Sequence, residues 1–358
     1  MSVFARSSNG RTSERERADP TASRGETRAT SPGGFKPVVG VSETMRVVFV
    51  THNDLGLACL EELADLGADL RAVFTRPRRE EIADQTDLAA FAEEENVPLY
   101  ETESVNDESV RARIADCDPD LLFVVGWSRL VERSVLDVPS VAALGMHPAP
   151  LPRGRGRAPI AWSLIEGLDE TALSFFHLVE EADAGDLVGQ RPIDIEREDD
   201  AATLYAKVVE AGRELIRSYY PRFEEGEMPR TPQDDDAATW WPKRTPDHGL
   251  VDWNQSPETL YDWIRGQSHP YPGAFSFLGD RRVTIWAANP PDGETAFCRP
   301  GELLYRDGDL LGVGAWEGRI ELTRLQVGDG DEIPAGKLVE RDGVELGDRF
   351  ENARDRLS

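Results

Sequence analysis

The sequence predicts an α/β protein in which a doubly wound parallel sheet is followed by a small β-barrel. Three observations predict this fold. Residues 46–51 form a β-branched apolar run that is typical of a strand buried on both faces. Similar runs alternate with helical stretches up to residue 125, as in the βα units of a parallel sheet. After residue 250 the apolar runs are short and are broken by Gly and Pro, which indicates a barrel.

The expected elements follow in order along the chain. Asn53 and Asp54 are candidates for the cap of a first helix that runs to about residue 66. Further helices are predicted over residues 88–95 and 108–114, and strands over 70–75, 98–100 and 121–125. Another strand covers 143–147, a hairpin at the sheet edge covers 173–179 and 188–195, and a helix over 201–224 closes the domain. In such sheets the ligand binds at the carboxyl ends of the strands.

Length and composition divide the chain into four parts. At 358 residues it exceeds the usual size of one domain, so two cores joined by a linker are expected. Residues 1–44 are rich in Ser, Thr, Arg, Gly and Pro, so we expect a disordered tail, with Met45 as a second candidate for the start of the protein. We expect the first domain over 45–225, the linker over 226–247, and the barrel over 248–350 with strands at 282–286, 310–313 and 319–322.

The charge balance bears on the partner. The chain has 67 acidic and 40 basic residues and a formal net charge of -27. Such a surface repels polyanions, because nucleic-acid binding needs clustered Lys and Arg, so tRNA and other nucleic acids are disfavoured as partners. A cell with very high internal salt would also select an acidic, halophile-like surface, so habitat is an alternative explanation of the charge.

The remaining composition favours a cytoplasmic protein without metal. No apolar run approaches the roughly 20 residues of a membrane helix, so no membrane contact is expected. Cys59, Cys117 and Cys298 have spacings that match neither a metal site nor a disulfide framework. Reduced thiols in the cytoplasm are therefore expected. The turn after the first strand, residues 51–56, lacks G-x-G-x-x-G, so a nicotinamide cofactor is not expected.

Two polar residues are candidates for chemistry. His147 ends a buried strand and leads into a loop with several prolines and glycines, an arrangement that fixes one polar group at a cleft. Asp183 lies in a tight turn, residues 181–186, between the paired strands. Taken singly, His147 is explained equally well as a structural histidine, and the turn residues are explained better by ordinary turn chemistry. Paired in space, the carboxylate would orient the imidazole and form an acid–base couple.

Four motifs stand along the chain in the same order as in one enzyme family. The loop that begins His147-Pro148 and contains Arg155-Gly156 is similar to the family's H-P-S-L-L-P-x-x-R-G loop, and residues 183–186 are similar to its D-T/A-G motif. Residues 125–128 match a loop of the folate pocket, and residues 242–253 with 270–274 resemble the second domain of the tRNA-type and aminoarabinose-type enzymes. Together these motifs resemble the N10-formyltetrahydrofolate-dependent formyltransferases. The resemblance covers about residues 45–350 and implies a Rossmann-like formyltransferase domain with an OB-like barrel.

The resemblance implies a role for each of these residues. His147 and Asp183 are the expected catalytic pair, and N10-formyltetrahydrofolate is the expected co-substrate. An amine would attack the formyl carbon while the pair moves its proton toward the departing nitrogen, without a covalent enzyme intermediate. The folate site is expected to comprise Val125, Gly126, Trp127, Ser128 and Asp186. The substrate loop is expected to comprise Pro148, Leu151, Pro152, Arg155 and Gly156.

One position departs from the family pattern. The family has a catalytic Asn two residues before the His, where this sequence has Gly145. In relatives that amide is thought to help hold the formyl oxygen, and loss of one such donor costs roughly 10²- to 10³-fold in rate. Ser128 and a backbone N–H near Gly145 are the candidates to replace it.

Several acceptors are open. The resemblance implies a small-molecule amine, with an amino-sugar nucleotide ranked first, tRNA second and glycinamide ribonucleotide third, since the last type generally lacks a barrel. Lys243, Arg244 and Arg265 could form a local basic patch that would favour tRNA. A function of another class is a non-catalytic folate or nucleotide binder in which Gly145 marks lost chemistry. The tryptophans of the second half are expected to pack the barrel: Trp240, Trp241, Trp253, Trp263 and Trp286.

Overall fold

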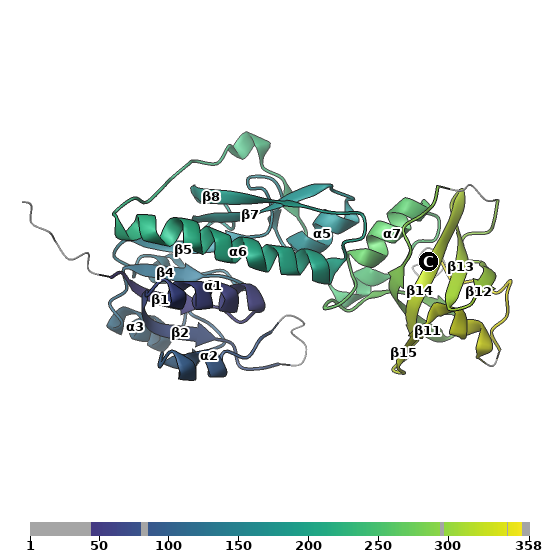
Figure 1. The fold of residues 1–358 in the computed structure, drawn as a ribbon, viewed down its shortest axis with the longest axis horizontal. Coiled ribbons are helices and arrows are strands. Elements are labelled where there is room, and N and C mark those ends of the chain that lie inside the picture. Colours follow the sequence, from purple (N-terminus) through teal and green to yellow (C-terminus); the bar gives the residue numbers. More distant parts are fainter. Residues whose placement is uncertain (1–43, 80–84, 294–296, 342, 353–358) are drawn as a thin grey trace, which may run out of the picture. The chain divides into compact units, whose positions relative to one another are not determined.

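The computed structural model describes residues 44–79, 85–293, 297–341 and 343–352. The expectation of a disordered tail therefore falls outside the described residues, apart from Thr44. The described part contains a mixed sheet with helices, followed by an antiparallel β domain (Figure 1). The prediction of an α/β fold with a second β domain is confirmed, while the limits 45–225, 226–247 and 248–350 remain predictions.

The first sheet has seven strands in the order β3-β2-β1-β4-β5-β7-β8 (Figure 1). The strands from β1 to β5 pair in parallel, and β7 and β8 add an antiparallel edge hairpin. The chain order reverses between β1 and β4, where a doubly wound sheet opens its ligand crevice. The bounds are β1 (Arg46–Val50), β2 (Asp69–Thr75), β3 (Leu99–Glu101), β4 (Leu121–Val124), β5 (Ala142–His147), β7 (Glu170–His177) and β8 (Leu187–Asp194).

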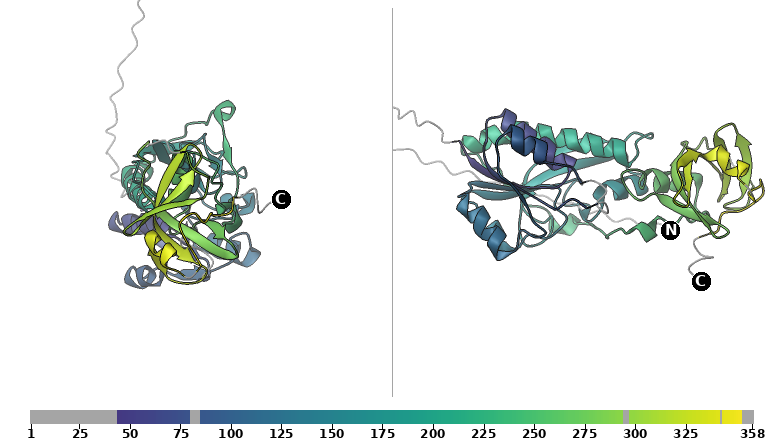
Figure 2. Two further views of the ribbon diagram at one scale, coloured as in Figure 1. Left: turned by 90° about the vertical axis from the view of Figure 1, so that its right-hand side faces the viewer. Right: turned by 90° about the horizontal axis from the view of Figure 1, so that it is seen from below.

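Helices cover both faces of this sheet because alternate side chains of each strand point to opposite faces. Val47 and Phe49 enter the core under α1 (Asp54–Asp65) and α6 (Ala201–Glu224), which lie side by side in Figure 2. Val48 and Val50 enter a second core with residues of α3 (Glu108–Asp116) and α4 (Arg133–Leu136). The sequence predicts α1, α2 (Ala89–Glu94), α3 and α6 within two residues. It does not predict α4 or α5 (Pro159–Ile165), since both are short.

The second domain is an antiparallel sheet with its own apolar core. Its strands run in the order β10-β11-β14-β13-β12, with β15 paired to β14. Trp253 is fully buried in this core and stacks on Phe350, with ring centroids 5.2 Å apart. The bounds are β10 (Ala274–Leu278), β11 (Arg281–Ala288), β12 (Leu303–Asp307), β13 (Leu310–Ala315), β14 (Gly318–Val327) and β15 (Glu332–Pro334).

The predicted linker packs against the first domain. Within it, β9 (Trp240–Trp241) pairs in parallel with β6 (Arg155–Gly156) of the loop after β5. The expectation that Trp240 and Trp241 pack the barrel is therefore wrong, because the main-chain pairing holds both residues on the loop. The segment 226–247 therefore joins the domains and also packs against the loop after β5.

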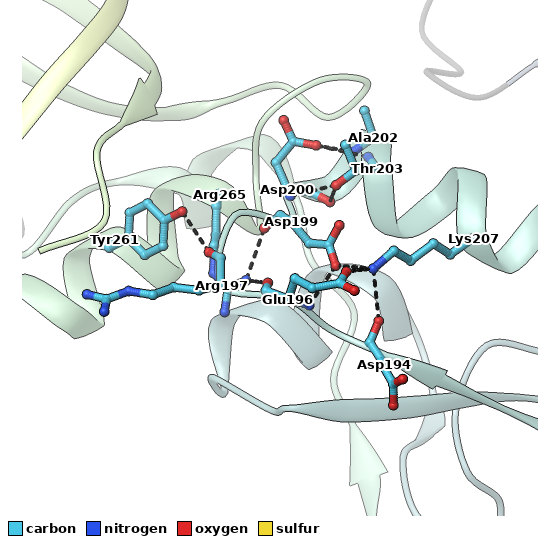
Figure 3. Close-up of polar contacts among 10 residues, drawn as sticks. All are labelled: Asp194, Glu196, Arg197, Asp199, Asp200, Ala202, Thr203, Lys207, Tyr261 and Arg265. Atoms are coloured by element: carbon cyan, nitrogen blue, oxygen red, sulfur yellow. Dashed lines mark hydrogen bonds and ion pairs between the residues drawn. The ribbon is translucent and has the colours of Figure 1, made fainter.

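Polar contacts connect the segment between β8 and α6, residues 195–200, with α7 (Pro257–Arg265), as Figure 3 shows. Arg265 is 8% exposed, and its Nη1 donates to the carbonyl oxygens of Glu196 and Asp199 at 3.2 and 3.0 Å. Because this guanidinium is buried and hydrogen-bonded, Arg265 does not join Lys243 and Arg244 in the basic patch considered above. Across the described ranges no helix has both the length and the apolar character needed to cross a membrane. The cytoplasmic location remains a prediction.

Candidate active site

Two residues that are distant in the sequence meet at the end of the first sheet. His147 is the last residue of β5, and Asp183 lies in the connection between β7 and β8. His147 Nδ1 lies 3.6 Å from Asp183 Oδ1. The histidine is 6% exposed, and the Asp183 side chain is 17% exposed. The structure thus brings together the two side chains on which the acid–base hypothesis depends.

A hydrogen bond orients the imidazole. His147 Nε2 lies 2.8 Å from the carbonyl oxygen of Gly154. A carbonyl oxygen only accepts, so Nε2 carries the proton and the neutral ring keeps its lone pair on Nδ1. Gly154 has a φ of +74°, and a Cβ there would lie 2.6 Å from the Trp241 ring, so glycine is required at this position. Nδ1 is thereby left as the proton acceptor beside Asp183.

Main-chain groups and one glutamine hold Asp183. Asp183 has a φ of +58°, a left-handed conformation that Asp and Asn tolerate better than most residues. Its Oδ2 accepts from the Gly156 N–H at 2.9 Å. Gln233 Nε2 donates to the carbonyl oxygens of Asp183 and Gly185 at 2.8 and 2.7 Å. The sequence does not predict this role of Gln233, because a polar residue in an irregular segment gives no signal of such a contact.

A cavity of about 610 Å³ lies beside the pair. It opens at the carboxyl ends of β1, β4 and β5, where a doubly wound sheet binds its ligand. Its volume lies within the roughly 300–1,000 Å³ typical of small-molecule sites. Eight of the predicted site residues line it: Gly126, Trp127, Ser128, Gly145, His147, Pro148, Gly156 and Asp183.

Other predicted site residues do not line this cavity, namely Val125, Leu151, Pro152, Arg155 and Asp186. The side chain of Val125 is fully buried in the core of the sheet. The carbonyl oxygen of Asp186 accepts from His177 N, and its carboxylate faces Arg230 at 3.8 Å. Membership of a sequence motif therefore does not by itself place a side chain in the cavity.

Arg155 fixes the loop after β5 to the segment before β9. It is 2% exposed, and its Nε and Nη2 donate to Gln233 Oε1 at 3.2 and 2.8 Å. Nη2 also donates to Asp235 at 2.7 Å, and the guanidinium lies 5.8 Å from the centroid of Trp240. These contacts explain why Arg155 does not face the cavity.

An apolar side chain lies beside Gly145 in the cavity wall. Leu178 packs over Gly145, and the predicted substitute Ser128 is exposed, with its carbonyl accepting from Arg157 at 3.0 Å. Two other lining residues, Trp127 and Arg76, have a buried N–H, Nε1 and Nε respectively, without a hydrogen-bond partner in the described structure. Because an unmatched buried donor is costly, these two atoms are places where a ligand oxygen would be stabilising.

The sequence also matches known families. Residues 45–219 match the formyl transferase family, and residues 243–342 match the formyl transferase C-terminal domain. The chain belongs to the formyl transferase family. As a formyltransferase it is an enzyme that transfers a one-carbon group, which confirms the resemblance noted from its motifs and its assignment to the transferases.

Solved formyltransferase structures share the fold. HypX from Aquifex aeolicus in complex with tetrahydrofolic acid has a TM-score of 0.61 at 21% identity, over 86% of this chain and 51% of that chain. The N-formyltransferase from Helicobacter canadensis, with folinic acid and dTDP-3-aminofucose, has a TM-score of 0.60 at 13% identity, over 78% of this chain and 98% of that chain. Methionyl-tRNA formyltransferase from Clostridium thermocellum has a TM-score of 0.51 at 16% identity, over 70% of this chain and 95% of that chain. The chain thus spans about half the length of the HypX structure.

Proposed function

We propose that this formyltransferase moves the formyl group of N10-formyltetrahydrofolate to the primary amine of an amino-sugar nucleotide. The observation that carries the reaction type is the approach of His147 Nδ1 to Asp183 Oδ1 at the cavity wall. The cavity suits a polar bicyclic ring, because Trp127 Nε1 and Arg76 Nε supply buried donors. Two solved relatives hold tetrahydrofolic acid and folinic acid, which supports the same co-substrate here.

The orientation of His147 supports a general-base role. As the amine nitrogen bonds to the formyl carbon, Nδ1 takes the proton that this nitrogen loses, and the carboxylate of Asp183 stabilises the imidazolium. The bond from the formyl carbon to N10 then breaks, and His147 returns the proton to N10. The products are the formamide and tetrahydrofolate, and the ring ends in its starting state.

The charges of the cavity support a small anionic acceptor. Five cationic side chains line it: Arg76, Arg129, Arg157, Lys243 and Arg244. Asp183 is the one carboxylate among its described lining residues. This excess is local, since the chain as a whole carries -27. A nucleotide-linked amino sugar fits a small cationic cavity, and the Helicobacter canadensis relative holds dTDP-3-aminofucose.

The tRNA alternative has a solved relative in its favour but the overall charge against it. An RNA stem needs a broad cationic surface, whereas the excess here is confined to the cavity. The non-catalytic binder is disfavoured by the oriented pair, because a protein that only binds has no need of a free Nδ1 beside a carboxylate.

One experiment tests the proposal. The full chain is incubated with N10-formyltetrahydrofolate and a panel of dTDP- and UDP-linked amino sugars, aminoacylated initiator tRNA and glycinamide ribonucleotide, and formyl products are detected by mass spectrometry. We expect an amino-sugar nucleotide to be formylated, and His147→Asn to abolish the product without loss of fold. Formylation of tRNA alone would overturn the choice of acceptor. Binding of folinic acid without any product would favour the binder.

A further inference from the structure

Among the described residues, three cations of the cavity lining have no acidic partner. Arg157 and Lys243 are exposed, Arg244 is half-buried, and within the described residues none of the three forms an ion pair with Asp or Glu. Arg157 Nη1 donates to the Ser128 carbonyl at 3.0 Å. Acidic residues outnumber basic ones in this chain by 67 to 40, so three cations without an acidic partner in one cavity are unusual.

The other two cations of the lining behave differently. Arg76 and Arg129 both face Glu103, at 3.7 and 3.4 Å. Each of the two therefore has an acidic partner, although both share it with Arg79. The lining cations without an acidic partner among the described residues are Arg157, which follows β6, and Lys243 and Arg244, which follow β9.

Arg244 is held in place before any ligand arrives. Its guanidinium lies 4.9 Å from the ring centroids of both Trp162 on α5 and Trp263 on α7. Nη2 donates to the His248 carbonyl at 3.0 Å and to Gln267 Oε1 at 2.5 Å. Burial lowers the pKa of Arg244, since the described structure supplies no carboxylate to offset desolvation.

The contacts of Arg244 leave part of its guanidinium available to a ligand. Among the described residues Arg244 Nε and Nη1 have no hydrogen-bond partner. A guanidinium fixed between two rings loses little freedom on binding and presents paired donors to phosphate oxygens. Lys243 and Arg157 line the same cavity and add two further positive charges.

We propose that Arg157, Lys243 and Arg244 form an anion site that binds the diphosphate of the acceptor nucleotide. The inference rests on the proposed function, because it assigns a part of that acceptor to a part of the same cavity. Three cations are enough to neutralise the diphosphate of a nucleotide-linked sugar, which carries about two negative charges. They do not match an RNA stem, which must also approach a surface of charge -27.

Titration calorimetry on the full chain tests the site. The probes are dTDP, UDP, thymidine, folinic acid and bulk tRNA, each at 0.15 M salt. The variants are Arg157→Gln, Lys243→Gln and Arg244→Gln. The matched control is Arg153→Gln, because Arg153 is an exposed arginine of the same loop that does not line the cavity.

We expect each of the three substitutions to weaken nucleoside diphosphate binding roughly tenfold to a hundredfold, as for loss of a hydrogen bond to a charged group. Thymidine, folinic acid and the control should change less than about twofold.

Each result has one meaning. Weaker folinic acid binding with unchanged diphosphate binding would assign the cations to the folate carboxylates and overturn the proposal. Tight tRNA binding that is lost in the same variants would overturn it in favour of RNA, and unchanged binding of every probe would overturn it outright. Arg157→Gln and Lys243→Gln alter exposed residues, so they test the site even where Arg244→Gln fails to fold. Should no amine be formylated while diphosphate binding still depends on the three cations, the proposed function fails and the anion site stands.

Discussion

The side chain of Leu178 fills the space beside Gly145. A Cβ built on Gly145 would lie 2.7 Å from Leu178 Cδ2 and 3.2 Å from the carbonyl oxygen of Val124, both closer than ordinary contact. The sheet register places it there, since Gly145 pairs with Phe176 and the Leu178 N–H donates to Ala143. The family's Asn would therefore have to displace the Leu178 side chain to fit at position 145.

We expect Gly145→Asn to lower the free energy of unfolding by about 1–3 kcal/mol, because the new side chain overlaps Leu178. We expect no gain in kcat while Leu178 occupies the space that the amide would need. Urea unfolding and formyl-transfer kinetics measure both quantities.

The double variant Gly145→Asn with Leu178→Ala provides the control. In a double-mutant cycle, the double variant should lose about 1 kcal/mol less unfolding free energy than the two single variants lose in sum. The reason is that truncation of Leu178 makes room for the Asn. Additive costs would show that Leu178 does not limit position 145.

A second prediction concerns the acid–base pair. Asp183→Asn retains an oxygen to accept from the Gly156 N–H but removes the negative charge beside His147 Nδ1. We expect kcat to fall roughly 10²- to 10⁴-fold, in the range of general acid–base catalysis, with KM for formyltetrahydrofolate changed only a few-fold. Steady-state kinetics and a thermal melt measure this, and wild-type kcat in a folded variant would contradict the role of Asp183.

The sequence predicts the parts of this site that depend on local rules. A buried strand that ends at a polar residue, followed by a rigid loop, indicates that His147 lies at a cleft. A tight turn between paired strands places Asp183 near the same edge of the sheet. Alternating apolar runs likewise predict the sheet and the long helix α6, because burial of one or both faces leaves a periodic pattern.

The contacts from the predicted linker could not be predicted. Gln233 reaches the Asp183 turn, and Trp241 packs on Gly154, across a gap of 50 or more residues in the chain. Such partners are chosen by the tertiary structure and leave no periodic signal. The same reason makes Arg155 look like a ligand contact in the sequence, although its charge is satisfied by Gln233 and Asp235.

A third prediction follows for Gln233 as a positioning residue. Gln233→Ala removes two donors to the Asp183 turn and the acceptor for Arg155. We expect a loss of about 1–3 kcal/mol in unfolding free energy and a roughly tenfold lower kcat. The variant Gln233→Glu keeps the acceptor for Arg155 but lacks the donors and places a carboxylate oxygen against the carbonyl oxygens of Asp183 and Gly185, so kcat should stay low. Full kcat in Gln233→Glu would show that the donors do not position Asp183.

The last prediction uses the ion pair at the start of the sheet. Asp120 accepts from Arg46 Nε at 3.0 Å and from Nη2 at 2.8 Å, which joins β1 to the residue before β4. These bonds hold the pKa of Asp120 well below its usual value. Because the folded-state pKa is depressed, the stabilisation is complete above the unfolded pKa of about 3.9 and is lost as the pH falls toward the folded value. Asp120→Asn should therefore lower the unfolding free energy by about 1–3 kcal/mol at pH 7, with a gap that narrows below about pH 4.

Urea midpoints of the wild type and of Asp120→Asn at pH 7, 5, 4 and 3.5 measure this gap, which is the difference in unfolding free energy between the two proteins. Asp118→Asn is the matched control, because the Asp118 side chain is 79% exposed and also pairs with Arg46. An exposed pair contributes about 0–1 kcal/mol, so this variant should remain close to the wild type at every pH. A gap for Asp120→Asn that stays constant from pH 7 to 3.5 would show that hydrogen bonding without charge accounts for its effect. A gap that closes on acidification assigns the stabilisation to the ionised carboxylate.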